Sequence, residues 1–212
     1  SVYGLLSTDA YPKAGFGNGL EEGAISFWFK ADATETGYIL GSYNNGTTTA
    51  LHIGIGTDNQ VGKINVNLRD ENSSAGSFAG SGTINDNQWH YAVLTLTPTG
   101  ATLYTDVLDA VVRTGTMDNY AVWQYPMVLL ARNQRGAIEG KFQGLVDDLK
   151  IYNYQWSQQD VAEEYYDVIG TASCISPQVV AGYDLNDDCK VDIGDFIIFA
   201  GAWLQDGLYP IQ

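Results

Sequence analysis

Short segments rich in β-branched and aromatic residues recur between residues 24 and 153, and clusters of Gly, Asn, Asp, Ser or Thr separate them. Segments of this composition predict β-strands. Several of them alternate apolar and polar residues, which is typical of antiparallel strands with one face buried and the other solvated. We therefore expect strands at 24–31, 36–43, 50–56, 63–70, 89–97, 101–107, 125–132 and 145–153.

The segment 63–70 shows the alternation most clearly, with Ile64, Val66 and Leu68 set against Asn65, Asn67 and Arg69. Many short strands at this spacing favour an antiparallel sandwich. The polar stretch 72–87 is predicted to be a loop. Helices are expected only at 157–168, where Ser157 is a suitable N-cap, and at 195–204. The chain is therefore predicted to be all-β, with two packed antiparallel sheets.

Composition limits the partners of the chain. Its 212 residues can bury one substantial core and leave room for a small appendage. Ten Lys and Arg against 25 Asp and Glu give a net charge of -15, which repels nucleic acid and anionic lipid surfaces. The apolar run 196–204 is far shorter than the roughly 20 residues that a membrane span needs, so we expect no insertion.

The start of the chain and its cysteines indicate where the protein works. The sequence begins at Ser1 without Met or a signal-peptide pattern, so we expect a mature secreted or cell-surface protein whose targeting segment has been removed. Its two cysteines, Cys174 and Cys189, either form one disulfide or remain free thiols. The extracellular character of the rest of the chain favours the disulfide.

Three longer runs, 87–106, 127–133 and 140–166, resemble the second half of a laminin-G-like jelly roll of the concanavalin A-like class. The signature comprises Trp-His at a strand start, a Leu-Tyr-x-Asp hairpin, and a Gly-x-hydrophobic-Asp-Asp strand that ends in Tyr. These positions are Trp89, His90, Leu103, Tyr104, Asp106, Gly144, Val146, Asp147, Asp148 and Tyr152. With 24–31 as the matching early strand, the resemblance covers 24–169 and implies a two-sheet jelly roll.

The resemblance also has consequences for single residues. It places Trp28, Trp89 and Trp156 at core positions. Val107 stands where the family usually has Gly, so we expect the hairpin after Asp106 to turn differently. The lead-in strand of the family is not recognisable in residues 1–20. Either these residues form that strand with a different sequence, or they leave a sheet edge for a partner.

A second resemblance lies at 184–195, the stretch DLNDDCKVDIGD, which is similar to the calcium loop of a type I dockerin, a relative of the EF-hand. Positions 1, 3, 5, 7, 9 and 12 of such a loop are Asp184, Asn186, Asp188, Lys190, Asp192 and Asp195. Calcium takes six to eight oxygen ligands, and short side chains at alternate positions point inward to supply them. Position 7 contributes its backbone carbonyl, so Lys190 fits. We therefore predict a Ca²⁺ ion in this loop.

Cys189 occupies position 6 of the loop, where Gly normally allows a sharp turn. A left-handed conformation costs a non-Gly residue on the order of 1 kcal/mol, whereas a disulfide closing a 15-residue loop stabilises by about 3 kcal/mol. A bridge to Cys174 would therefore outweigh the strain. Dockerins that bind cohesins carry two such repeats and this chain has one, so a cohesin-like partner is only a second alternative.

Concanavalin A-like glycosidases place their two carboxylates with a string of the Glu-x-Asp-x-x-Glu type. The chain contains no such string, so we expect that it is not an enzyme. His52 and His90 are assigned structural roles. Asp147 either accepts hydrogen bonds within the sheet or lies near a second metal ion, as in some laminin-G relatives.

Trp123 and Tyr125 share one face if their segment is a strand, and aromatic faces stack on sugar rings. They are either buried in the sandwich or form a glycan-binding patch together with Arg132 and Asn133.

The sequence thus predicts a jelly roll at 1–170, a linker at 171–183 and a calcium loop with its helix at 184–212. We expect a non-catalytic extracellular recognition or adhesion module that binds a glycan or an extracellular protein. The first alternative is a structural subunit that forms a homo-oligomer, polymer or surface layer through its N-terminal segment or its C-terminal helix. That helix is too small to bury its apolar face alone, so it should pack on the jelly roll or on a neighbouring molecule.

Overall fold

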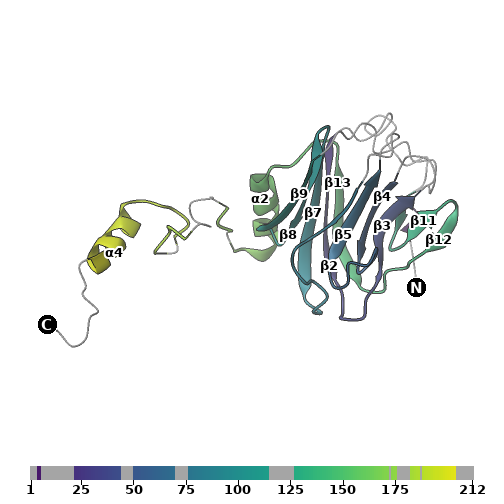
Figure 1. The fold of residues 1–212 in the computed structure, drawn as a ribbon, viewed down its shortest axis with the longest axis horizontal. Helices are drawn as coiled ribbons and strands as arrows, with labels where there is room; N and C mark the ends of the chain where they lie inside the picture. The colour runs from purple at the N-terminus through teal and green to yellow at the C-terminus, as the bar shows by residue number, and fades with distance from the viewer. Residues whose placement is uncertain are drawn as a thin grey trace. The chain divides into compact units, whose positions relative to one another are not determined.

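A computed structural model of the chain describes residues 4–5, 22–43, 50–69, 76–114, 127–171, 173–175, 182–186 and 188–203. It divides into two compact units, Ser1–Val161 and Ala162–Gln212. The first unit is a sandwich of two β-sheets, drawn in purple to green in Figure 1. The predicted boundaries at 170 and 183 stay a prediction.

The larger sheet of the sandwich has the order β1-β10-β3-β4-β5-β6, and the hairpin β11–β12 joins β3 through β11. Its strands are β1 (Gly4–Leu5), β3 (Gly37–Tyr43), β4 (Ala50–Ile55), β5 (Ile64–Arg69), β6 (Gly76–Ala79), β10 (Val128–Leu129), β11 (Arg132–Gln134) and β12 (Ala137–Glu139). All pairs are antiparallel except that of β11 with β3.

The smaller sheet has the order β13-β2-β7-β8-β9 and is antiparallel throughout. Its strands are β2 (Gly23–Lys30), β7 (Trp89–Thr97), β8 (Gly100–Thr105), β9 (Asp109–Thr114) and β13 (Leu145–Tyr152). The predicted two-sheet antiparallel jelly roll is confirmed.

The core lies between the two sheets because each inner strand turns alternate apolar side chains toward the other sheet. It is built from Ile25, Phe27, Phe29, Leu51, Ile53, Ile55, Ile64, Val66, Leu68, Leu94, Leu96 and Leu103, all of them fully buried. Each such side chain stabilises the fold by about 1.5–3 kcal/mol relative to leaving it exposed.

The outer face of the smaller sheet is also covered. The Trp28 ring packs on Tyr91 with 5.0 Å between centroids, and both side chains are buried. The backbone N–H of Trp156 donates to Thr95 Oγ1 at 3.1 Å, and its buried ring packs against Tyr152. The segment that follows β13 therefore closes over this face.

Two helices follow the strands, α2 (Gln158–Ile169) and α4 (Ile193–Trp203), close to the two predicted ones. Ser157 and Asp160 form a reciprocal cap: Asp160 N–H donates to Ser157 Oγ at 3.2 Å, and Ser157 N–H donates to Asp160 Oδ2 at 2.6 Å. The predicted N-cap is confirmed. Within the described residues, neither helix is long and apolar enough to cross a membrane.

Three expectations were wrong. The predicted loop 72–87 contains β6, which pairs with β5. Of the predicted strand 125–132, the described residues 127–132 are strand at Val128–Leu129 and again at Arg132, where β11 begins, so the strand is interrupted. Trp89 is 44% exposed rather than part of the core, because it is the first residue of β7 at the rim of the sheet.

The N-terminus supplies a short lead-in strand within its own chain. Gly4 pairs with Leu129 and Leu5 pairs with Val128, both in antiparallel register. Gly4 and Leu5 therefore form a lead-in strand whose sequence differs from that of the family. This is the first of the two alternatives expected for this segment.

The β8–β9 hairpin turns through two residues in left-handed conformations, Asp106 at φ 49° and Val107 at φ 69°. Val107 thus takes, at some cost in strain, a backbone conformation that Gly adopts freely. Its side chain is fully buried, and this burial offsets the strain.

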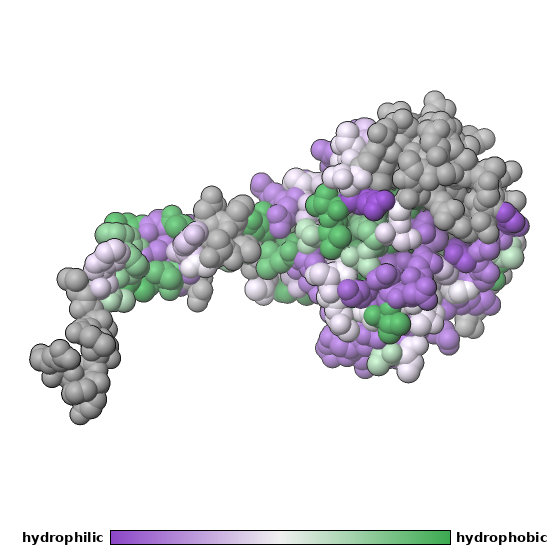
Figure 2. Space-filling model, in the orientation of Figure 1, coloured by the Kyte–Doolittle hydropathy of each residue, from purple (hydrophilic) through white to green (hydrophobic). Residues whose placement is uncertain are grey.

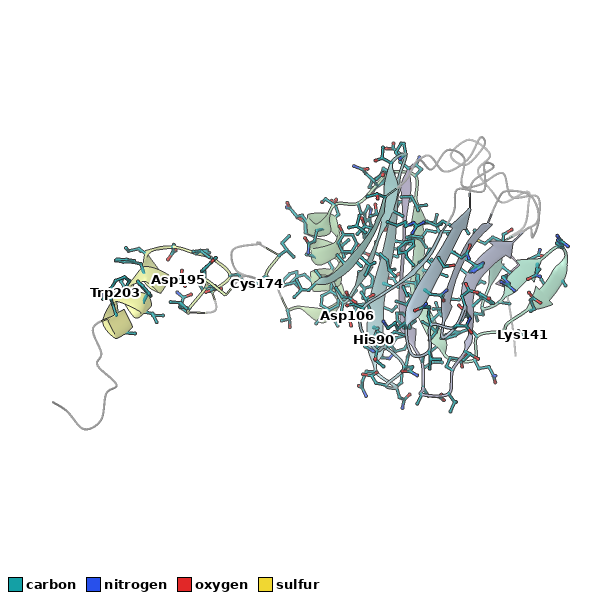
Figure 3. All side chains as sticks on the ribbon, in the orientation of Figure 1. His90, Asp106, Lys141, Cys174, Asp195 and Trp203 are labelled. Atoms are coloured by element: carbon teal, nitrogen blue, oxygen red, sulfur yellow. A yellow bond between two sulfur atoms is a disulfide. The ribbon has the colours of Figure 1, made fainter. Side chains whose placement is uncertain are left out.

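His90 lies between Asp106 of this hairpin and Asp86, which precedes β7; Figure 3 labels His90 and Asp106. Its Nδ1 lies 2.7 Å from Asp106 Oδ2, and its Nε2 lies 3.1 Å from Asp86 Oδ1. The other Asp106 oxygen accepts the N–H of Tyr91 at 2.9 Å. The hydrogen bond that His90 donates to Asp106 is the main cause that raises the pKa of His90. Burial opposes this shift, and the hydrogen bond to Asp86 adds to it. The geometry supports the structural role expected for His90.

The second unit contains the disulfide that the sequence favours. Cys174 and Cys189 are bonded, with 5.3 Å between their Cα atoms. Cys189 has φ 65°, the left-handed conformation expected at position 6 of the loop.

The first prediction concerns pH. A His pKa raised by folding stabilises the fold fully below the unfolded value of about 6.5, and this contribution disappears as pH rises through the folded value. We expect the free energy of unfolding of the wild type to exceed that of His90→Gln by about 1 kcal/mol or less at pH 5.5. The difference should shrink toward pH 8.5. Urea unfolding across this range tests it, and a difference that grows with pH would contradict the assignment.

The second prediction separates the stabilisation by the disulfide from the backbone strain at Cys189. Breaking the bridge should cost the loop about 3 kcal/mol, and replacing Cys189 by Gly should recover on the order of 1 kcal/mol of that. Amide exchange at 182–195 should therefore be slowest in the wild type, faster in Cys174→Ser/Cys189→Gly, and fastest in Cys174→Ser/Cys189→Ser. Equal protection in all three proteins would show that the bridge does not stabilise the loop.

Candidate functional site

Polar side chains gather on the face of the larger sheet that points away from the core. Leu51 and Ile53 of β4 enter the core, so His52 between them points to the opposite face, and Asn65 of β5 does the same. Gly41 pairs with His52 in the register of β3 and β4. A Cβ on Gly41 would lie 2.9 Å from His52 Cβ and 3.3 Å from Arg132 Cβ, so its lack of a side chain lets these two residues approach each other.

A turn after β4 adds Asp58 to this face. His52 Nε2 lies 3.2 Å from Asp58 Oδ2, and Asn65 Nδ2 donates to the same oxygen at 3.1 Å. Thr57 Oγ1 in turn donates to Asn65 Oδ1. The hydrogen bond from His52, more than any other contact, holds the pKa of Asp58 below its usual range. The Asp58 carboxylate is therefore held in a fixed position by His52 and Asn65.

Arg132 of β11 enters the same network. Its guanidinium carbon lies 4.4 Å from the centroid of the Tyr38 ring, and that ring meets His52 edge-on at 4.9 Å. Arg132 also forms an ion pair with Glu139, directly opposite on β12. The guanidinium side chain is 15% exposed and the Glu139 side chain 42% exposed, so this end of the network reaches solvent.

Two amide side chains have spare hydrogen-bonding capacity. Asn67 Nδ2 donates to Ser77 Oγ at 2.7 Å, but Asn67 Oδ1 is buried without a partner among the described residues. Gln134 lies two residues beyond Arg132 on β11, and its Oε1 is likewise buried without a partner among the described residues. A buried acceptor left without a donor costs about 1–3 kcal/mol, so each can gain by accepting a ligand hydroxyl.

We call this set the outer-face cluster: Tyr38, His52, Asp58, Asn65, Asn67, Arg132, Gln134 and Glu139. It combines amide, carboxylate, imidazole and guanidinium groups beside one aromatic ring. Convergent donors and acceptors fixed by a rigid sheet are suited to a ligand with many hydroxyl groups.

The residues predicted from sequence are only partly brought together. Arg132 belongs to the outer-face cluster, whereas its neighbour Asn133 faces the other side of β11, is buried, and accepts the N–H of Gly136 at 2.9 Å. Trp123 and Tyr125 lie outside the described residues. Sequence reasoning missed the partners of Arg132, because only the fold brings β4, β5 and β11 together.

Asp147 lies on β13 at the edge of the smaller sheet. Its Oδ1 accepts the N–H of Asp148 at 2.8 Å, next to a β-bulge between Asp147 and Lys150. A second metal site at Asp147 stays a prediction. Within the part of the chain that the structure describes, no three His, Cys, Asp or Glu side chains are grouped as metal ligands.

The loop at 184–195 is organised by its own carboxylates. Asp184 accepts the N–H groups of Asp188 at 3.2 Å and Cys189 at 2.8 Å. Asp188 Oδ1 accepts the N–H of Lys190 at 2.9 Å, and Asp192 Oδ1 accepts the N–H of Gly194 at 2.7 Å. These bonds curl the loop around its short acidic side chains.

Asp195, labelled in Figure 3, ties the two ends of the loop together from the first turn of α4. Its Oδ1 accepts the N–H of Leu185 at 2.7 Å, and its Oδ2 accepts that of Asp192 at 2.7 Å. The residue is 4% exposed, and the Asp192 hydrogen bond is the main cause that lowers its pKa. Asp195 is thus an ionised, buried carboxylate at the base of the loop.

An apolar groove of about 320 Å³ lies beside this loop, lined mainly by Tyr183, Leu185, Val191, Phe196 and Phe199. Farther along α4, the Trp203 ring packs edge-on against Phe199 and is largely exposed. Figure 2 shows apolar residues gathered over α4.

Comparison with known proteins gives the relationships of the first unit. The model of a family described as the Concanavalin A-like lectin/glucanases superfamily matches residues 10–162. No curated protein matches the chain significantly.

Several solved structures share the fold at low sequence identity. The chain is similar to the CBM40 of the Ruminococcus gnavus IT-sialidase bound to alpha2,3 sialyllactose, with a TM-score of 0.58, 14% identity, and coverage of 74% of this chain and 89% of that one. It is also similar to the native heptameric SAP-like pentraxin of Limulus polyphemus, with a TM-score of 0.51, 15% identity, and coverage of 74% and 72%.

The family match spans more than half of the chain, and the matched residues contain the two-sheet sandwich. The chain belongs to the Concanavalin A-like lectin/glucanases superfamily.

Proposed function

We propose that this protein is a non-catalytic extracellular module that binds a glycan through the outer-face cluster. The observation that carries the proposal is the network around Arg132 and Asp58. Fixed charged groups there reach solvent beside amide oxygens that have no donor among the described residues. Sugar hydroxyls donate and accept hydrogen bonds at once, so they satisfy such a mixed set well.

Two further observations support this proposal. The chain shares its fold with a carbohydrate-binding module whose structure contains sialyllactose, which makes a sugar the first ligand to test. The disulfide between Cys174 and Cys189 suits an oxidising extracellular environment.

A binding role fits the described carboxylates better than catalysis. Burial raises the pKa of Glu35, the direction that a general acid requires, but its Oε1 accepts the N–H of Gln143 at 3.1 Å and ties two loops together. Asp58 and Glu139 are each occupied by a cationic or hydrogen-bonding neighbour. A glycosidase needs one carboxyl group that donates a proton and a second that attacks or activates water.

We also propose that the loop at 184–195 binds one Ca²⁺ ion, as a single dockerin-like repeat. The ligands would be Asp184, Asn186, Asp188, the carbonyl of Lys190, Asp192 and Asp195. The donor set is all oxygen, which calcium prefers, and the buried carboxylate of Asp195 supplies the negative charge at position 12. A bound ion would neutralise part of the repulsion among these carboxylates.

The other partners remain alternatives. A cohesin-like protein or a second copy of the chain would bury the exposed apolar residues of α4, such as Phe196, Ile197 and Trp203. Assembly through the N-terminal segment has less support, because Gly4 and Leu5 pair with β10 of their own chain.

The third prediction tests glycan binding by calorimetry against a panel of soluble neutral and acidic oligosaccharides that includes sialyllactose. Arg132→Gln should weaken binding by about 10- to 100-fold, because a hydrogen bond to a charged group contributes about 1.5–3 kcal/mol. Arg135→Gln is the matched control, since this exposed arginine lies at the tip of the same hairpin. Equal affinities in the two variants, or no binding across the panel, would refute the proposed site.

The fourth prediction tests calcium binding by the same method in the full chain. The wild type should take up one ion, and Asp184→Ala and Asp195→Ala should each lose that site. Asp167→Ala on α2 should retain it, because this exposed acid lies outside the loop. Unchanged stoichiometry in the two loop variants would exclude this assignment.

A further inference from the structure

Arg132 is the guanidinium of the outer-face cluster, and its neighbours fix its orientation. The Tyr38 ring lies 4.4 Å from the guanidinium carbon and is only 7% exposed, so it is too buried to stack on a sugar ring. A Cβ on Gly41 would lie 3.3 Å from the Arg132 side chain, so β3 approaches that side chain closely. Tyr38 therefore positions Arg132, and the described cluster meets a ligand through hydrogen bonds and charge.

Glu139 neutralises this guanidinium from the neighbouring strand. Arg132 Nη2 donates to Glu139 Oε1, and the two residues stand opposite each other in the register of β11 and β12. The Glu139 side chain is 42% exposed and the Arg132 side chain 15% exposed. A ligand that arrives from solvent therefore meets the carboxylate of this pair as well as its guanidinium.

Asp58 adds a second fixed carboxylate to the cluster. The hydrogen bond from His52 is the main cause that lowers the pKa of Asp58, and the charge of Arg132 makes a smaller contribution to the same shift. The positive charge of Arg132 is thus shared between two carboxylates. These three side chains carry a net charge of -1, and a protonated His52 would bring the sum only to zero.

The other cations of this region lie at its exposed periphery. Arg135 is at the tip of the β11–β12 hairpin, and Lys141, whose backbone bridges to Tyr38, follows β12. Both residues are exposed. Water and salt screen exposed charges strongly, so the nearer carboxylates set the charge balance at Arg132.

Two acceptors of the cluster need a donor from the ligand. Asn67 Oδ1 and Gln134 Oε1 are buried without a partner among the described residues. A hydroxyl group can donate to them, whereas an ionised carboxylate has no hydrogen to give. Hydrogen bonding and charge therefore favour the same class of ligand, a neutral glycan rich in hydroxyl groups.

We propose that Glu139 sets the specificity of the outer-face cluster, so that the site takes neutral glycans and excludes acidic ones; this inference rests on the glycan-binding function proposed above. The Glu139 carboxylate competes with a ligand carboxylate for Arg132 and also repels it. A neutral hydroxyl suffers neither effect. It can still accept a hydrogen bond from the guanidinium of Arg132, because an arginine side chain carries five N–H donors.

Calorimetry with matched pairs of oligosaccharides tests the ligand class. Sialyllactose and trigalacturonic acid are each compared with their methyl esters, which lack the charge and keep the rest of the structure, and neutral oligosaccharides complete the panel. The tightest ligands of the wild type should be uncharged, and no acid should bind more tightly than its ester. An acid among the tightest ligands would overturn the specificity and leave glycan binding intact, whereas no binding across the panel would overturn both.

A charge-removing variant tests the role of Glu139 itself. Glu139→Gln keeps the shape of the side chain and should raise the affinity for the acids relative to their esters at least tenfold, because Arg132 becomes available to a carboxylate. Glu22→Gln is the charge-matched control, since Glu22 is exposed and precedes β2 of the other sheet. It should leave the relative affinity unchanged. Equal relative affinities in the two variants would reject Glu139 as the determinant.

Salt dependence tests the same point without a substitution. Raising the salt concentration from 0.1 to 1 M shortens the Debye length from about 10 Å to about 3 Å. Because the carboxylates of the cluster repel acidic glycans, the affinity of the wild type for the acids relative to their esters should rise with salt. A relative affinity that falls with salt would show that Arg132 attracts the acids, and the proposal would be wrong.

Discussion

The packing of two sheets through alternate side chains is the constraint on which the rest of the molecule depends. Phe27 of β2 belongs to the same buried cluster as alternate residues of β4 and β5, so every second residue of those two strands is committed to the core. The intervening residues must face outward. The same alternation that places Ile53 in the core therefore places His52 and Asn65 in the outer-face cluster, and a one-residue change of register would exchange the two sets.

The sequence predicts a strand well where the strand's own residues carry a strong apolar and aromatic pattern. The strand at 89–97 was expected with the bounds observed, because most of its residues are aromatic, β-branched or otherwise apolar. β6 was missed since its Gly and Ser residues are typical of a loop, and its strand structure depends on pairing with β5. Arg132 could be named as a candidate from sequence, but Asp58 could not, because the chain folds it back onto His52 only through the turn after β4.

Among the described residues of the second unit, the loop at 184–195 is ordered by local hydrogen bonds and a disulfide rather than by a buried core. Asp184 and Asp195 satisfy backbone N–H groups along the loop, and the disulfide fixes its sharpest turn at Cys189. These contacts shape the loop but leave the apolar residues of α4 exposed. A ligand that binds only the folded form would stabilise such a unit, whether the ligand is a cation in the loop or a protein on the helix.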